Sequence, residues 1–144
     1  MTDQGRVLAL DVGDVRIGVA VTDPTRTIAQ PVEVYRRIGY GPDSEHIRAL
    51  CEHYETINVL LGLPLNMDGT RGGQAQKVMA LGEVLAKKSL NVFYWDERLT
   101  TVTAEGALIE GGVSRLERKN YVDKVAASVI LQQWLAAGQP ELHP

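Results

Sequence analysis

The chain has 144 residues, of which 44% are hydrophobic and 23% charged, and its formal net charge is −3. These totals fit one globular domain spanning residues 1–144, with a core large enough to fold without disulfides or a structural metal. They exclude a membrane-spanning helix, since no run approaches roughly 18 consecutive apolar residues, and they disfavour nucleic-acid binding through bulk positive charge.

Hydrophobic periodicity divides the chain into strands and helices. Continuous apolar runs are typical of strands buried on both faces, and apolar residues at three- and four-residue spacing are typical of helices with one buried face. In chain order we predict strands at Arg6–Val12, Arg16–Thr22 and Thr27–Arg36, a helix at Asp43–Tyr54, a strand at Ile57–Leu63, a helix at Gln74–Lys88, a strand at Asn91–Trp95, and helices at Thr100–Glu110 and Lys119–Ala137.

Turn-forming residues mark the ends of these elements. Gly13-Asp14 joins the first two strands as a hairpin, Gly39–Gly41 is a predicted turn, Pro42 precedes the first helix, and Gly138 ends the last one. This order predicts an α/β fold. We expect a five-stranded mixed sheet, a three-strand antiparallel meander plus two parallel strands, flanked by helices.

One carboxylate lies late in the strand that is predicted to be central. Asp11 follows the apolar run Val7–Leu10, and a buried carboxylate without compensation is costly. Either Asp11 binds a cation, or it caps the following turn or pairs with Arg16. We favour the cation.

A second carboxylate belongs to the apolar stripe of the last helix. Ala127, Ile130 and Trp134 follow Asp123 at helical spacing, so Asp123 occupies a core-facing position one turn into the helix. The alternative role is a favourable interaction with the helix dipole in its first turn.

A third acidic position follows the predicted strand Asn91–Trp95. Asp96 and Glu97 are neighbours at its carboxyl end, where open α/β sheets place ligands. Successive residues leaving a strand point to different sides, so we expect only one of the two to reach a site, and the strand pattern leaves the choice open.

Carboxylates on three separate elements favour a hard-cation site. Oxygen ligands suit Mg²⁺ or Mn²⁺, and phosphate oxygens would complete the coordination. Zinc is disfavoured because Cys51 is a lone cysteine and His46, His53 and His143 lack ligand spacing with it.

Four blocks of sequence stand out together. They are Leu10-Asp11-Val12-Gly13 leading into Arg16-Ile17-Gly18-Val19-Ala20, then Gly62-Leu63-Pro64-Leu65-Asn66-Met67-Asp68-Gly69-Thr70, then Asp96-Glu97-Arg98-Leu99-Thr100-Thr101, and finally Asp123 followed by Ala126-Ala127 and Ile130-Leu131. They resemble the YqgF/RuvX family, whose members are assigned as pre-16S ribosomal RNA nucleases and Holliday junction resolvases. Any one block is weak evidence, whereas four in this order across nearly the whole chain are specific.

The resemblance implies a ribonuclease H-like fold and a metal-dependent nuclease. It places the catalytic, metal-binding acids at Asp11, Glu97 and Asp123, and so selects Glu97 over Asp96. Two Mg²⁺ or Mn²⁺ ions could clamp a scissile phosphodiester at these acids, with Asp11 bridging both ions, Glu97 holding one and Asp123 the other. The resemblance implies hydrolysis that leaves a 5′-phosphate. The chain departs from the family at Asp14-Val15, where a small hydroxyl residue and a lysine are common, so a phosphate contact there is expected to be lost or taken over by Arg16.

Substrate contacts are expected from a polar loop and from basic residues near the acids. Phosphate contacts dominate nucleic-acid affinity, whereas stacking aromatics are few; Tyr40, Tyr94 and Tyr121 are the candidates. The predicted substrate-binding residues are Arg16, Asn66, Asp68, Thr70, Arg98, Arg118 and Lys119.

Several readings of this pattern remain open. We expect processing of the 5′ end of pre-16S ribosomal RNA, and the first alternative is a Holliday junction resolvase acting on branched or single-stranded DNA, which a stable homodimer would favour. A non-catalytic nucleic-acid-binding module is a further alternative and predicts no metal dependence. An Asp-Val-Gly hairpin also opens ATP-binding domains of the actin and sugar-kinase type, but those need two domains around a nucleotide.

Two features bear on the expected compartment. The first residues contain no apolar signal core, and the lone Cys51 cannot form an internal disulfide, which fits a reducing compartment. We therefore expect a cytoplasmic protein with no membrane partner.

Overall fold

The computed structural model describes residues 5–96 and 115–141, and between residues 115 and 124 it describes the backbone only. The elements are β1 (Val7–Val12), β2 (Arg16–Thr22), β3 (Ala29–Arg36), α1 (Tyr40–His53), β4 (Asn58–Leu63), α2 (Gly73–Ala86), β5 (Asn91–Asp96) and α4 (Arg115–Ala136). None of the described helices is long and apolar enough to cross a membrane.

The strands form one five-stranded mixed sheet in the order β3-β2-β1-β4-β5. β1 pairs antiparallel with β2, and β2 with β3, which makes the predicted meander. β4 lies parallel to β1 and β5 parallel to β4. The predicted fold class is therefore confirmed, with β1 at the centre of the sheet.

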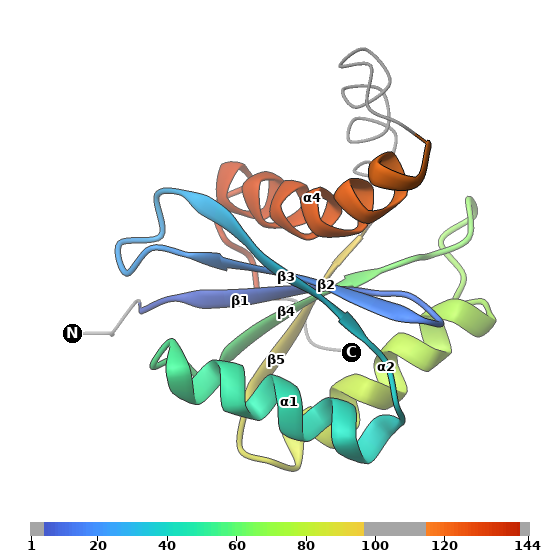
Figure 1. The fold of residues 1–144 in the computed structure, drawn as a ribbon, viewed down its shortest axis with the longest axis horizontal. Coiled ribbons are helices and arrows are strands. Elements are labelled where there is room, and N and C mark those ends of the chain that lie inside the picture. Colours follow the sequence, from blue (N-terminus) through green and yellow to red (C-terminus); the bar gives the residue numbers. More distant parts are fainter. Residues whose placement is uncertain (1–4, 97–114, 142–144) are drawn as a thin grey trace.

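Helices cover both faces of the sheet (Figure 1): α1 and α2 lie on one side and α4 on the other. Alternate residues of β1 divide between the two cores, as the pleat of a strand requires. Leu8, Leu10 and Val12 pack with α1 and α2, whereas Val7 and Ala9 pack with α4. Together with the pairing register, this alternation assigns strand residues to a face, except at the register shift in β3 opposite Val19 and Ala20.

Two predicted helix starts were wrong. α1 begins at Tyr40, so Gly41 and Pro42 belong to its first turn rather than to a preceding turn. Proline is tolerated there because the first helical N–H groups have no partner within the helix. α4 begins at Arg115 instead of Lys119, through residues with good helix propensity.

The end of α4 was predicted correctly. Gly138 adopts φ +92°, and the N–H of Gln139 donates to the carbonyl oxygen of Trp134 at 3.0 Å. A glycine in left-handed conformation after the last turn is the usual means of satisfying such carbonyls. The predicted helix Thr100–Glu110 lies outside the described residues.

Candidate active site

Asp11 lies near the carboxyl end of the central strand and is half-buried. It continues the alternation of Val7 and Ala9, so its side chain is on the face that α4 covers. Across the β1–β2 pair it lies directly opposite Gly18. Because glycine has no side chain, β2 places nothing over the carboxylate at this position.

Helix α4 supplies the cover of this face and begins at the same end of the sheet (Figure 1). The apolar stripe predicted for it is confirmed, since Ala127, Ile130 and Trp134 are each 0% exposed. Position 123 belongs to this helix, one turn before Ala127. The side chain of Asp123 lies outside the described part of the chain.

The structure separates Asp96 from Asp11. Asp96 is the last residue of β5, where it pairs with Leu63. Along β5, Val92 and Tyr94 face α1 and α2, whereas Phe93 faces α4, so the alternation places Asp96 on the face away from Asp11. Glu97 and Arg98 lie outside the described residues, so their predicted roles stay predictions.

The described part of the candidate site fits a hard cation in its chemistry. Asp11 offers carboxylate oxygens, the ligands that Mg²⁺ and Mn²⁺ prefer. Among the residues with described side chains, no group of three or more His, Cys, Asp or Glu is arranged to hold a metal. Of the three predicted acids, only Asp11 has a described side chain.

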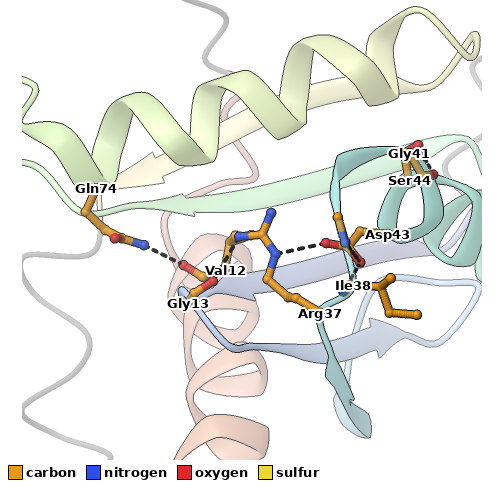
Figure 2. Close-up of polar contacts among 9 residues, drawn as sticks. Val12, Gly13, Arg37, Ile38, Gly41, Asp43, Ser44 and Gln74 are labelled. Carbon is orange, nitrogen blue, oxygen red and sulfur yellow. Dashed lines mark hydrogen bonds and ion pairs between the residues drawn. The ribbon is translucent and has the colours of Figure 1, made fainter.

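The backbone that follows Asp11 is held by side chains from two other elements (Figure 2). Gln74, at the start of α2, donates from Nε2 to the carbonyl oxygen of Val12 at 3.2 Å. Arg37, just after β3, donates from Nη1 to the carbonyl oxygen of Gly13 at 3.0 Å. Sequence reasoning missed both contacts, because nothing in their local pattern indicates partners so far along the chain.

Arg37 is itself held by a buried acid. Its Nε donates to Oδ2 of Asp43 at 2.9 Å, and Asp43 is 0% exposed. Burial opposes ionisation of Asp43, but hydrogen bonds from the N–H groups of Ile38 and Gly39 and from Arg37 outweigh it and hold its pKa below the ordinary value. The pair therefore stays charged and fixes the turn after Asp11.

The predicted polar loop after β4 is closed by hydrogen bonds between its own side chains. Asn66 donates from Nδ2 to Oγ1 of Thr70 at 2.9 Å, and Thr70 donates from Oγ1 to Oδ1 of Asp68 at 2.6 Å. The structure thus brings the three predicted residues together at the carboxyl end of β4, with Met67 at the tip 90% exposed. Their side chains build the turn, which was the alternative to substrate binding.

Among the basic and aromatic candidates, Arg16 opens β2 on the face of Asp11. Tyr94 is buried at 6% exposure and cannot stack on a base, so that expectation was wrong. Tyr40 is 40% exposed and lies under the guanidinium of Arg37, 5.3 Å from its ring centre. The side chains of Arg118, Lys119 and Tyr121 lie outside the described residues.

Two of the residues that were disfavoured as zinc ligands have structural surroundings. Burial raises the pKa of the Cys51 thiol to about 12, which makes it a poor nucleophile or metal ligand. His46 stacks on Tyr35 with ring centres 4.0 Å apart and contacts Glu33. Neither residue lies on the Asp11 face of the sheet.

Two solved structures share the fold of this chain. Residues of this chain superpose on a Thermus thermophilus RuvC in complex with a Holliday junction substrate with a TM-score of 0.59 at 13% identity, covering 95% of this chain and 98% of that one. A second Thermus thermophilus RuvC structure gives a TM-score of 0.55 at 13% identity, covering 94% and 98%. The chain therefore has a ribonuclease H-like fold of the RuvC type.

The sequence itself identifies the family. The profile of the RuvX family, described as Holliday junction resolvase, matches residues 5–137. A "Putative pre-16S rRNA nuclease" of Heliobacterium modesticaldum is 47% identical over 133 residues, covering 92% of this chain and 89% of that protein. A protein of the same name from Clostridium acetobutylicum is 48% identical over 132 residues, covering 90% and 97%. The chain belongs to the RuvX family.

Proposed function

We propose that this protein is a metal-dependent nuclease that hydrolyses phosphodiester bonds and processes the 5′ end of pre-16S ribosomal RNA during ribosome biogenesis. The proposed substrate is the one named for two relatives, which are 47–48% identical over about nine-tenths of the chain. The observation that carries the proposal is the position of Asp11, half-buried near the carboxyl end of the central strand, on the face covered by α4.

Asp11, Glu97 and Asp123 would hold the Mg²⁺ or Mn²⁺ ions of a two-metal site through carboxylate oxygens. When bound, these ions would neutralise the scissile phosphate and lower the pKa of an attacking water. The chain's own residues keep Asp11 in place. Gln74 and Arg37 bind the carbonyl oxygens of the two residues that follow it, so the backbone beside the carboxylate is already fixed when substrate arrives.

Nucleic acid would cross the Asp11 face at the carboxyl end of β1. Arg16, which was predicted to bind substrate, lies on that face. We propose that Arg98, Arg118 and Lys119 bind further phosphates of the same nucleic acid. The loop of Asn66, Asp68 and Thr70 would approach the substrate from β4. We further propose that residues 1–144 act as a single nuclease domain in the cytoplasm.

A second candidate function is Holliday junction resolution. It is favoured by the description of the RuvX family and by the likeness of the fold to RuvC. Both functions use the same site, because metal-bound carboxylates act on phosphate and do not distinguish ribose from deoxyribose. A resolvase cuts two strands, so this candidate also predicts a stable homodimer.

The test is a cleavage assay of the purified protein on labelled precursor ribosomal RNA, single-stranded RNA and DNA, and a four-way DNA junction, each with Mg²⁺, Mn²⁺ or EDTA. Metal-dependent cleavage of the precursor supports the proposal. Cleavage confined to the junction supports the second candidate, and nucleic-acid binding without cleavage under any condition overturns both.

A further inference from the structure

Two arginines face each other across the strands beside Asp11. Arg16 of β2 pairs in register with Arg36 of β3, and two residues further along the same strands Gly18 pairs with Val34. Gly18 is also the partner of Asp11. Arg16 and Arg36 therefore share the face of Asp11, one row nearer to the end of the sheet.

The backbone hydrogen bonds bring this pair close. The N–H of Arg37 donates to the carbonyl oxygen of Val15 at 2.8 Å, one residue outside the Arg16–Arg36 pair on each strand. That pattern makes Arg16 and Arg36 a non-hydrogen-bonded pair. In such pairs the Cα atoms are about 4.5 Å apart, and the side chains lie closer together than in a hydrogen-bonded pair.

No acid in the described part of the chain compensates Arg36. Its side chain is exposed and forms no ion pair with a described residue. The nearest acid along β3, Glu33, pairs in register with Val19 and contacts His46, so it lies on the other face. A neighbouring arginine does have an acid: Arg37 points to that other face and binds Asp43.

We propose that Arg36 and Arg16 form a binding site for a backbone phosphate of the nucleic-acid substrate, next to the phosphate that Asp11 addresses. The two arginines leave neighbouring strands side by side on the face of Asp11, and guanidinium forks suit phosphate oxygens. The site directs the substrate from the centre of the sheet toward its β3 edge. This inference rests on the proposed function and adds a residue, Arg36, that the sequence pattern did not indicate.

The test measures binding of labelled single-stranded RNA and DNA by fluorescence anisotropy, in Ca²⁺ and over a range of salt concentrations. Arg36→Ala is expected to weaken binding and to lower the slope of log affinity against log salt by about 0.7, the value for one lost phosphate contact on a single strand. Arg16→Ala/Arg36→Ala should lower it by about 1.4. Lys87→Ala removes an equal charge from an exposed residue at the C-terminal end of α2 and should leave the slope unchanged.

A second variant separates phosphate binding from an effect on the sheet. Arg36→Glu reverses the charge at an exposed position, so nucleic-acid binding should fall while the melting temperature of the protein alone stays close to that of the wild type. If Arg36 serves only the structure or the solubility of the protein, both Arg36 variants should bind RNA and DNA as the wild type does. That result overturns the inference. An equal loss in Lys87→Ala also overturns it, because the effect is then one of net charge.

The outcomes are distinct from those of the proposed function. If the wild-type protein binds neither strand in Ca²⁺, the proposed function fails and this inference with it. If the wild-type protein binds and the slope of Arg36→Ala equals the wild-type slope, this inference alone fails.

Discussion

Arg37 and Asp43 form a buried ion pair, with 2.9 Å between Nε and Oδ2, and the same guanidinium reaches the carbonyl oxygen of Gly13 at 3.0 Å. Gly13 is two residues after Asp11. An acid at the start of α1 thereby fixes the turn that follows the candidate catalytic strand. This chain of contacts joins β3, α1 and the end of β1 (Figure 2).

Asp43→Asn should destabilise the protein and reduce its acid sensitivity. Removing one charge of a buried pair costs about 3–5 kcal/mol. Because the pKa of Asp43 is lowered from 3.8 on folding, its contribution is present above pH 4 and is lost as the pH falls below that value. Urea unfolding between pH 7 and pH 2 should show a shallower decline for the variant than for the wild type.

The matched control for this substitution is Glu45→Gln. Glu45 lies on the same helix, but it is exposed and its ion pairs with Arg48 and Lys88 are at the surface. Exposed pairs contribute little to stability, so this variant should unfold close to the wild type at pH 7. An equal loss in both variants would show that the burial of Asp43 is not what matters.

Gly82→Ala should also destabilise the protein, although alanine is the better helix former. A Cβ at this position of α2 would lie 2.1 Å from the hydroxyl oxygen of Tyr94, which is buried. Overpacking of this kind costs about 1–3 kcal/mol, against a propensity gain of about 1 kcal/mol. Chemical denaturation of the variant measures the difference.

Tyr94→Phe provides the internal check on that prediction. Without the hydroxyl, the nearest ring atom to the new Cβ is Cζ at 3.1 Å, so Gly82→Ala should cost less in the Tyr94→Phe background. Gly73→Ala, where no neighbouring atom lies within 4 Å of the added Cβ, should be neutral or stabilising. Additive effects of Gly82→Ala and Tyr94→Phe would contradict the steric explanation.

Glu97→Gln should impair cleavage far more than Asp96→Asn. The alternation of β5 places Asp96 on the face that packs with α1 and α2, away from Asp11. Asp96→Asn should therefore cost no more than the roughly 10–100-fold loss typical of residues that support a ligand, and Glu97→Gln should cost more. Initial rates on the preferred substrate decide this, and similar losses would remove the basis for choosing Glu97.

The sheet was predictable because its strands are unusually apolar. β1 and β4 are apolar at all but one position each, and such runs are typical of strands covered on both faces. The start of α1 was not predicted, because Pro42 reads as a boundary from sequence although a first helical turn accepts it.

The candidate site was predictable only where an acid interrupts an apolar pattern. Asp11 stands out for that reason. Asp43 does not, since an acid after Pro42 is ordinary at the start of a helix, and its burial depends on Arg37 and on the path of β3. The face of each residue likewise depends on register, which is why Arg36 and the orientation of Asp96 emerged only from the strand pairing.

Asp11→Asn should abolish cleavage while leaving the fold intact. The half-buried carboxylate lies opposite Gly18 on the face that α4 covers, and replacing a charge that metal would compensate should raise, or leave unchanged, the melting temperature of the metal-free protein. Asp14→Asn is the control, since it makes the same charge change three residues later at an exposed position paired with Lys77. Cleavage rates and thermal melts in EDTA measure both effects. Retained cleavage by Asp11→Asn, or a melting temperature well below that of the wild type, would mean that Asp11 serves the fold rather than the reaction.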